Sequence, residues 1–130
     1  MQNMNNTEND MFKQISDWID NTLINNSMDN IVAIAFNLYD DGNNTWSLEM
    51  VGTSEFDIDD SDWACNEVSD FGTRDNPFVW NAESSWEDIL QSVSTILKKY
   101  LEEGKNADRL KMLEGIGVGF VDGDIEILYA

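Results

Sequence analysis

Ser84–Gly104, SSWEDILQSVSTILKKYLEEG, is the stretch of sequence that decides the fold. Its apolar residues recur every three or four positions, which predicts a helix with one buried face. These residues are Trp86, Ile89, Leu90, Val93, Ile96, Leu97, Tyr100 and Leu101. Ser84 and Glu87 predict a capping box at the start, and Gly104 predicts a left-handed residue at the end. An apolar face of this length needs a surface to cover.

A hairpin before this helix supplies such a surface. Two strands, Ile31–Tyr39 and Trp46–Gly52, are predicted on either side of the turn-forming cluster DDGNN. Pairing Tyr39 with Thr45 sets Leu38 opposite Trp46, and it places most of the large apolar residues on one face. That face holds Val32, Ile34, Phe36, Leu38, Trp46, Leu48 and Met50. The opposite face holds Ala33, Ala35, Asn37, Ser47 and Glu49, which suits solvent or light cover.

A second hairpin follows the helix, in GIGVGFVDGDIEILYA, residues 115–130. Asp122-Gly123 predicts a two-residue turn, because both positions tolerate positive φ. The register then sets Val118 opposite Ile127 and Ile116 opposite Tyr129, with six apolar residues on one face. The bare backbone of Gly117 and Gly119 on the other face permits a close approach or a bend. These glycines do not predict a phosphate loop, because neither a helix nor a lysine follows them.

The remaining segments complete a single α+β domain over residues 8–130. Glu8–Asn25 predicts an amphipathic helix, Asn106–Leu113 a short helix, and residues 1–7 a disordered tail. Ser54–Glu83 is irregular, and we expect a short helix or an extra strand within it. The predicted order is α-β-β-(irregular)-α-β-β. It forms a mostly antiparallel sheet of about four to six strands, with two main helices packed on one face.

Missing residue types restrict the chemistry. The chain has no histidine and one cysteine, Cys65, which excludes a Ser-His-Asp triad, a Cys-His pair and zinc sites built on histidine or on cysteines alone. Asp57–Asp62 resembles the start of a calcium loop, but Asp62 replaces the required glycine and Val68 replaces the bidentate glutamate. A solvated acidic loop is the preferred interpretation. An enzyme of this composition would have to work with carboxylates, Tyr, Lys or a carboxylate-bound metal. No pattern of residues declares a reaction, and our leading expectation is a non-enzymatic protein without catalytic residues, metal ligands or a cofactor.

The net charge of −19 is the main functional clue. Residues 1–83 carry seventeen acids against Lys13 and Arg74, a net of −15. Such a polyanion is steered towards basic proteins and away from nucleic acid and anionic membranes. No apolar run approaches the ~20 residues of a membrane span. The start, MQNMNNTEND, lacks the basic and apolar parts of a secretory signal, so we expect a cytoplasmic protein.

The acids concentrate in one window together with aromatic residues. Residues 55–75 hold eight acids and one base, Arg74, which we expect to act as an internal tether. Acids steer and pair with Lys or Arg across an interface, and aromatic residues serve as anchors. The predicted partner-binding residues are Glu55, Asp57, Asp59, Asp60, Asp62, Glu67 and Asp70. Alternatively, these acids are a solvated surface, and most of the nearby aromatic residues belong to the core.

Two stretches resemble small acidic immunity proteins of bacterial polymorphic-toxin and contact-dependent-inhibition systems. They are IVAIAFNLYDDGNNTWSLEMVGTSEFDIDDSDWACNEV, residues 31–68, and GVGFVDGDIEILY, residues 117–129. The resemblance implies a compact cytoplasmic α+β protein that binds and blocks a basic toxin domain, such as a nuclease. One related group of immunity proteins carries a Trp-Gly signature, which this sequence lacks. The resemblance carries no functional residue over to a position of this chain.

Two other functions remain open at this point. The protein could be a cytoplasmic adaptor or regulatory domain whose charge serves only solubility. A carboxylate-metal hydrolase is the third alternative, since 26 acids make chance pairs of carboxylates certain.

Overall fold

A six-stranded mixed sheet forms the centre of the computed structural model, which describes residues 6–73, 75–121 and 123–130, without the side chains of residues 6–9, 69 and 70. The strand order is β3-β2-β1-β5-β6, and β4 also pairs with β2. The strands are β1 (Ala33–Gly42), β2 (Thr45–Thr53), β3 (Glu67–Gly72), β4 (Phe78–Asn81), β5 (Gly115–Phe120) and β6 (Glu126–Tyr129). The helices are α1 (Asn6–Asn25), η1 (Ser61–Cys65, a 3-10 helix), α2 (Trp86–Glu103) and α3 (Ala107–Leu110). The predicted α+β class is confirmed.

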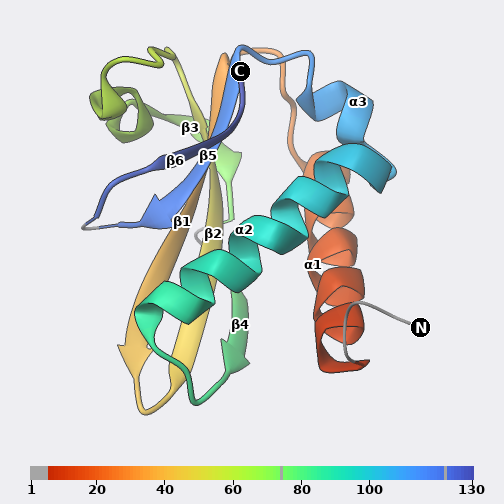
Figure 1. The fold of residues 1–130 in the computed structure, drawn as a ribbon. Helices are drawn as coiled ribbons and strands as arrows, with labels where there is room; N and C mark the ends of the chain where they lie inside the picture. Colours follow the sequence, from red (N-terminus) through yellow and green to blue (C-terminus); the bar gives the residue numbers. More distant parts are fainter. Residues whose placement is uncertain (1–5, 74, 122) are drawn as a thin grey trace.

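Helices α1 and α2 lie on one side of the sheet, and the η1 segment lies on the other (Figure 1). The main core forms where the helices meet the apolar face of β1, β2 and β5. Phe36, Leu48 and Leu97 are essentially inaccessible there, as the hydrophobic pattern predicts. Among the described strands only β1 and β5 pair in parallel, so the sheet is mostly antiparallel, as expected.

The ends of α2 differ in detail from the prediction. Ser85, not Ser84, is the N-cap, and its hydroxyl accepts a hydrogen bond from the Asp88 amide at 3.2 Å. Gly104 is extended, with φ −67° and ψ 153°, rather than left-handed. Its amide donates to the Tyr100 carbonyl, which closes the last turn without a positive φ. Trp86 is 55% exposed because it lies at the first turn, beyond the edge of the core.

The first hairpin keeps the predicted faces but pairs two residues further along. Tyr39 lies opposite Ser47, not Thr45, and Leu38 lies opposite Leu48, not Trp46. A shift of two residues leaves every side chain on its own face. The reason is the turn: Asn43 and Asn44 both have positive φ, as a tight two-residue hairpin turn requires. The predicted pairing of Tyr39 with Thr45, which leaves all five residues of DDGNN in the loop, is therefore wrong.

The second hairpin departs further from the prediction. Ile116 pairs with Tyr129 as expected, but an irregularity then sets Gly117 opposite Ile127 and Val118 opposite Glu126. Ile125 and Ile127 therefore pack on the second face, away from the helices, and the predicted single apolar face is wrong. The connection spans 121–125. Gly123 has no positive φ, and Asp122 lies outside the described residues.

The irregular segment contains both of the features expected as alternatives, a short helix and added strands. Strands β3 and β4 share one edge of β2, with β4 pairing with its first half and β3 with its second. Helix α1 begins at Asn6, so two residues of the predicted tail are helical, and residues 1–5 lie outside the description.

A small polar network joins α1, α2 and the start of α3. The Tyr100 hydroxyl donates to Asp20 at 2.5 Å and accepts from the Asn106 amide at 3.1 Å. The Asn106 side-chain amide also donates to Asp20, at 2.9 Å. Burial, and secondarily the hydrogen bond to Asp20, raise the pKa of Tyr100 well above its usual value. Asp20 is therefore a structural residue rather than part of a free acidic surface.

Leu97→Ala tests the main core. The side chain is 1% exposed, so truncation leaves a cavity and is expected to lower the free energy of unfolding by ~2–5 kcal/mol. Urea denaturation measures the loss. Leu90→Ala, at a half-buried position of the same helix, is the control and should cost clearly less. Equal costs for the two variants would contradict the assigned face of α2.

Candidate functional site

The second face of the sheet carries the segment between β2 and β3, residues 54–66, here called the acidic segment. Trp63 anchors it: the side chain is 2% exposed and packs against Ala33, Ala35 and Val51. Its indole N–H has no hydrogen-bond partner in the described structure, so packing alone holds the ring. Phe56 adds an edge contact to Trp63, with ring centroids 4.9 Å apart at 64°.

Small residues on neighbouring strands make room for these rings. In the parallel register Ala33 lies beside Gly115 and Ala35 beside Gly117, so no large side chain projects from this part of the second face. A Cβ built on Gly115 would lie 2.1 Å from the Phe56 ring. That distance is far shorter than a van der Waals contact. The Phe56 ring can therefore occupy its observed position only because residue 115 has no side chain. The light cover expected on this face is in fact an aromatic anchor.

Backbone and side-chain hydrogen bonds fix the course of the segment. Its two ends meet where the Ser54 amide donates to the Asn66 carbonyl at 2.9 Å. The Asn66 side chain donates to the Glu55 carboxylate. Asp57 accepts from the Asp59 amide at 2.9 Å, and Asp60 caps η1 by accepting from the Asp62 amide at 3.0 Å. Three of the predicted partner-binding acids thus also shape the loop that displays them.

The predicted partner-binding residues that can be described all reach solvent. Glu55, Asp57, Asp59, Asp60, Asp62 and Glu67 are exposed and come from one continuous stretch of the second face. The side chain of Asp70 and all of Arg74 lie outside the described residues, so the predicted tether stays a prediction. In the described part of the chain, Asp57, Asp59, Asp60 and Asp62 form no ion pair.

Most basic residues lie on the opposite side of the molecule. Lys98, Lys99 and Lys105 belong to α2 or directly follow it, and Arg109 and Lys111 belong to α3 or directly follow it. Lys98 pairs with Glu126 at 3.2 Å, and the Lys99 ammonium lies 4.4 Å from the centre of the Phe12 ring. The helix layer therefore carries both signs of charge, whereas the acidic segment carries one.

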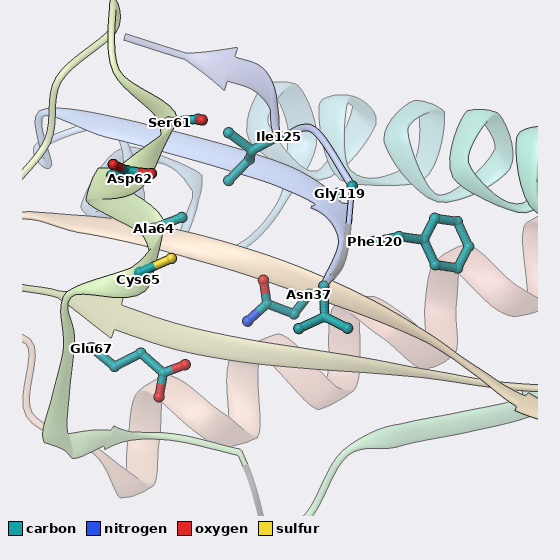
Figure 2. Close-up of a pocket in the computed structure, with 11 residues that line it drawn as sticks. Asn37, Ser61, Asp62, Ala64, Cys65, Glu67, Gly119, Phe120 and Ile125 are labelled. Atoms are coloured by element: carbon teal, nitrogen blue, oxygen red, sulfur yellow. The ribbon is translucent and has the colours of Figure 1, made fainter.

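A cavity of about 340 Å³ opens between η1 and the end of β5 (Figure 2). Here it is called the η1 cavity. Ser61 lies next to Ile125 at its mouth, and Asp62 of η1 also lines it. Asn37 of β1 lies on its floor, and Glu67 lies at its lower edge. The Phe120 ring points away from it, towards the helix side, where it contacts Trp46 and Trp86. The cavity is thus polar at η1 and apolar on the side of Ile125.

A buried carboxylate lies next to the cavity floor. Glu49 is almost fully buried and accepts hydrogen bonds from the Tyr39 hydroxyl at 2.8 Å and from the Asn37 amide at 3.4 Å. Sequence reasoning missed Asn37, Ile125 and the cavity itself. The available signal was the stripe of small residues on β1 and β5, which indicates that another segment approaches closely.

The described residues do not support a metal centre. No group of three or more Asp, Glu or Cys side chains within 6–73, 75–121 and 123–130 is placed to hold a metal ion. Carboxylates that hold Ca²⁺ converge on one point, whereas Asp57 and Asp60 each turn to a backbone amide of their own loop.

Comparison with models of known protein families, with curated proteins and with solved structures finds no match for this chain. Within the part that the structure describes, no helix has the length and apolar character needed to cross a membrane.

Two substitutions test whether Trp63 holds the acidic segment. Trp63→Ala removes the anchor and is expected to lower the free energy of unfolding by ~3–5 kcal/mol. Trp63→Phe should cost much less, because it keeps an aromatic ring and gives up an indole N–H that has no partner. Guanidinium denaturation and limited proteolysis measure both effects, and proteolysis of Trp63→Ala should begin within 54–66. Cleavage elsewhere first would contradict the anchoring role.

Proposed function

We propose that the protein is a non-enzymatic immunity protein that binds and neutralises a basic toxin domain through the acidic segment. One observation carries the proposal: a rigidly seated loop presents several carboxylates to solvent without neutralising them. Asp57, Asp59, Asp60 and Asp62 repel one another and form no described ion pair. Like charges held together in a folded loop cost stability, and a basic partner offsets that cost on binding.

The mechanism is steric and electrostatic occlusion. A toxin that acts on nucleic acid must present Lys and Arg to phosphate groups. An acidic loop of fixed shape competes for those same groups, and it does so without any reaction. Because the loop is already ordered, association loses little conformational entropy, which favours tight binding.

The alternatives receive less support. A carboxylate-metal hydrolase needs converging ligands, and the described residues hold no such group. An adaptor whose charge serves only solubility explains the acids but not the packing of their loop through Trp63 onto Ala33 and Ala35. A functional partner explains both.

Partner capture followed by a toxicity assay tests the function directly. The tagged chain is used as bait in cells of the source organism, and the captured protein is identified by mass spectrometry. The expected partner is a basic domain whose production stops growth unless this chain is made in the same cell. A captured partner with an acidic binding face, or one that is harmless on its own, would contradict the proposal.

Neutralising three acids tests where the partner binds. The triple variant Asp59→Asn, Asp60→Asn, Asp62→Asn should fold normally, because Asn retains the capping oxygen at position 60. Its affinity for the partner should fall by roughly 2–5 kcal/mol if these acids meet desolvated Lys or Arg. Isothermal titration calorimetry measures the loss, and thermal unfolding checks the fold.

The matched control removes three acids from the helix side. Asp10→Asn, Glu102→Gln and Glu103→Gln change exposed residues of α1 and α2 with the same change in net charge. Asp20 is unsuitable as a control, because it holds Tyr100 and Asn106. Equal losses from both triple variants would mean that only net charge matters. A larger loss from the control would place the interface on the helices.

Salt dependence provides a separate test. Attraction between the acidic segment and a basic partner is screened over ~8–10 Å at physiological ionic strength. The association rate, measured by stopped-flow fluorescence, should therefore fall steeply as salt rises, and the dissociation rate should change little. An association rate that is independent of salt would exclude electrostatic steering.

A further inference from the structure

We propose that the η1 cavity is a receptor for one arginine side chain of the basic partner. This inference rests on the proposed function in one respect, namely that the arginine belongs to a basic partner protein. The cavity lies between η1, β1 and the end of β5, and of the exposed acids Asp62 and Glu67 also line it (Figure 2).

The polar groups around the cavity mostly accept hydrogen bonds. Asp62 and Glu67 contribute carboxylates, and no Lys or Arg lines the cavity among the described residues. Asn37 donates its amide N–H to Glu49 at 3.4 Å, which leaves its amide oxygen turned towards the cavity. In the described structure that oxygen accepts no hydrogen bond. A ligand that satisfies the Asp62 carboxylate and the Asn37 amide oxygen must bring donors.

The shape and the apolar wall select among possible donors. Ile125 and Ala64 line the cavity beside the polar groups, so the occupant needs an apolar part as well as a charged head. At about 340 Å³ the cavity lies at the small end of the range of ligand pockets, so it has no room for a folded segment of the partner. Arg buries its aliphatic stem along apolar surface and presents five N–H donors in a plane. Arg therefore satisfies several separated acceptors at once, which a Lys ammonium does less well.

The groups at the cavity are held in place by the fold. Asp62 and Ser61 are fixed by η1, whose N-cap is Asp60, and Asn37 is fixed by the sheet. An arginine that enters the cavity meets groups already in place, so few side chains need to be ordered on binding. Arg residues in central, desolvated pockets are frequent energetic hot spots of interfaces.

An NMR titration of the full chain tests the cavity without any partner. The probe is N-acetyl-L-arginine amide, whose blocked ends leave only the side-chain charge. N-acetyl-L-citrulline amide, which is nearly isosteric and neutral, is the control ligand. The arginine probe should shift the signals of Asn37, Ser61, Ala64 and Ile125, and the citrulline probe should not. Shifts spread over all exposed acids, or equal shifts with citrulline, would overturn the proposal.

Two variants of the same loop sharpen the test. Asp62→Asn removes a carboxylate at the cavity, and Asp59→Asn removes an exposed one from the same loop that does not line the cavity. The dissociation constant for the arginine probe should rise about threefold or more in Asp62→Asn and less than about twofold in Asp59→Asn. Equal effects would overturn the proposal. Equal affinity for N-acetyl-L-lysine amide at the same residues would overturn the assignment to arginine.

The outcomes separate the cavity from the proposed function. If the arginine probe does not bind but a toxic basic partner still depends on Asp59, Asp60 and Asp62, the cavity assignment fails and the function stands. If the probe binds at the cavity but the captured partner is harmless, the function fails and the arginine receptor stands.

Discussion

The packing of Trp63 on a floor of small residues is the interaction on which the second face of the molecule depends. Trp63 packs on Ala33 and Ala35 of β1. The neighbouring Phe56 ring occupies the space that a side chain at Gly115 of β5 would need. Burying one aromatic side chain of this kind contributes on the order of 1.5–3 kcal/mol. That gain offsets part of the conformational entropy lost when the loop is ordered and part of the repulsion between its like charges. The loop then places Asp62 and Ser61 at the edge of the η1 cavity.

The two faces of the sheet therefore serve different purposes. The helix face contains the large apolar core, and its surface carries acids and bases in one layer. The second face contains a small satellite core below a surface of one charge sign. The proposed basic partner would be attracted to the second face and would gain little from the first. Because the acidic segment is seated on the centre of the sheet, its carboxylates keep the fixed geometry that the proposed binding requires.

The α+β class, the main helix and the apolar face of the first hairpin could be predicted from sequence, because hydrophobic periodicity records burial directly. The register of the first hairpin could not be predicted in the same way. The number of residues of DDGNN that remain in the loop depends on whether Asn43 and Asn44 adopt positive φ. The register of the second hairpin was also predicted wrongly. An irregularity between Ile116 and Gly117 turns Ile127 to the other face of the sheet, and no local sequence pattern marks this irregularity.

The candidate site was predictable in part. Composition identified the acidic stretch, since eight acids in 55–75 stand out in any sequence. It did not identify the cavity, because Asn37 and Ile125 lie far from that stretch in the chain and meet it only through the parallel pairing of β1 and β5. A single sequence does not show directly which distant strands pair. Here the only indication was the alternation of Ala residues in β1 and of Gly residues in β5.

Amide hydrogen exchange of the acidic segment tests the central claim most directly, namely that Trp63 holds the carboxylates in a fixed arrangement. The amides of Ser54 and Asn66 donate to backbone carbonyls in the folded loop. If the loop is seated as described, both amides should exchange at least about a hundredfold more slowly than in an unstructured peptide, as expected for a locally stable unit. Exchange of both at the unstructured rate, with β1 and β2 still protected, would show that the acids belong to a mobile loop and would contradict the account.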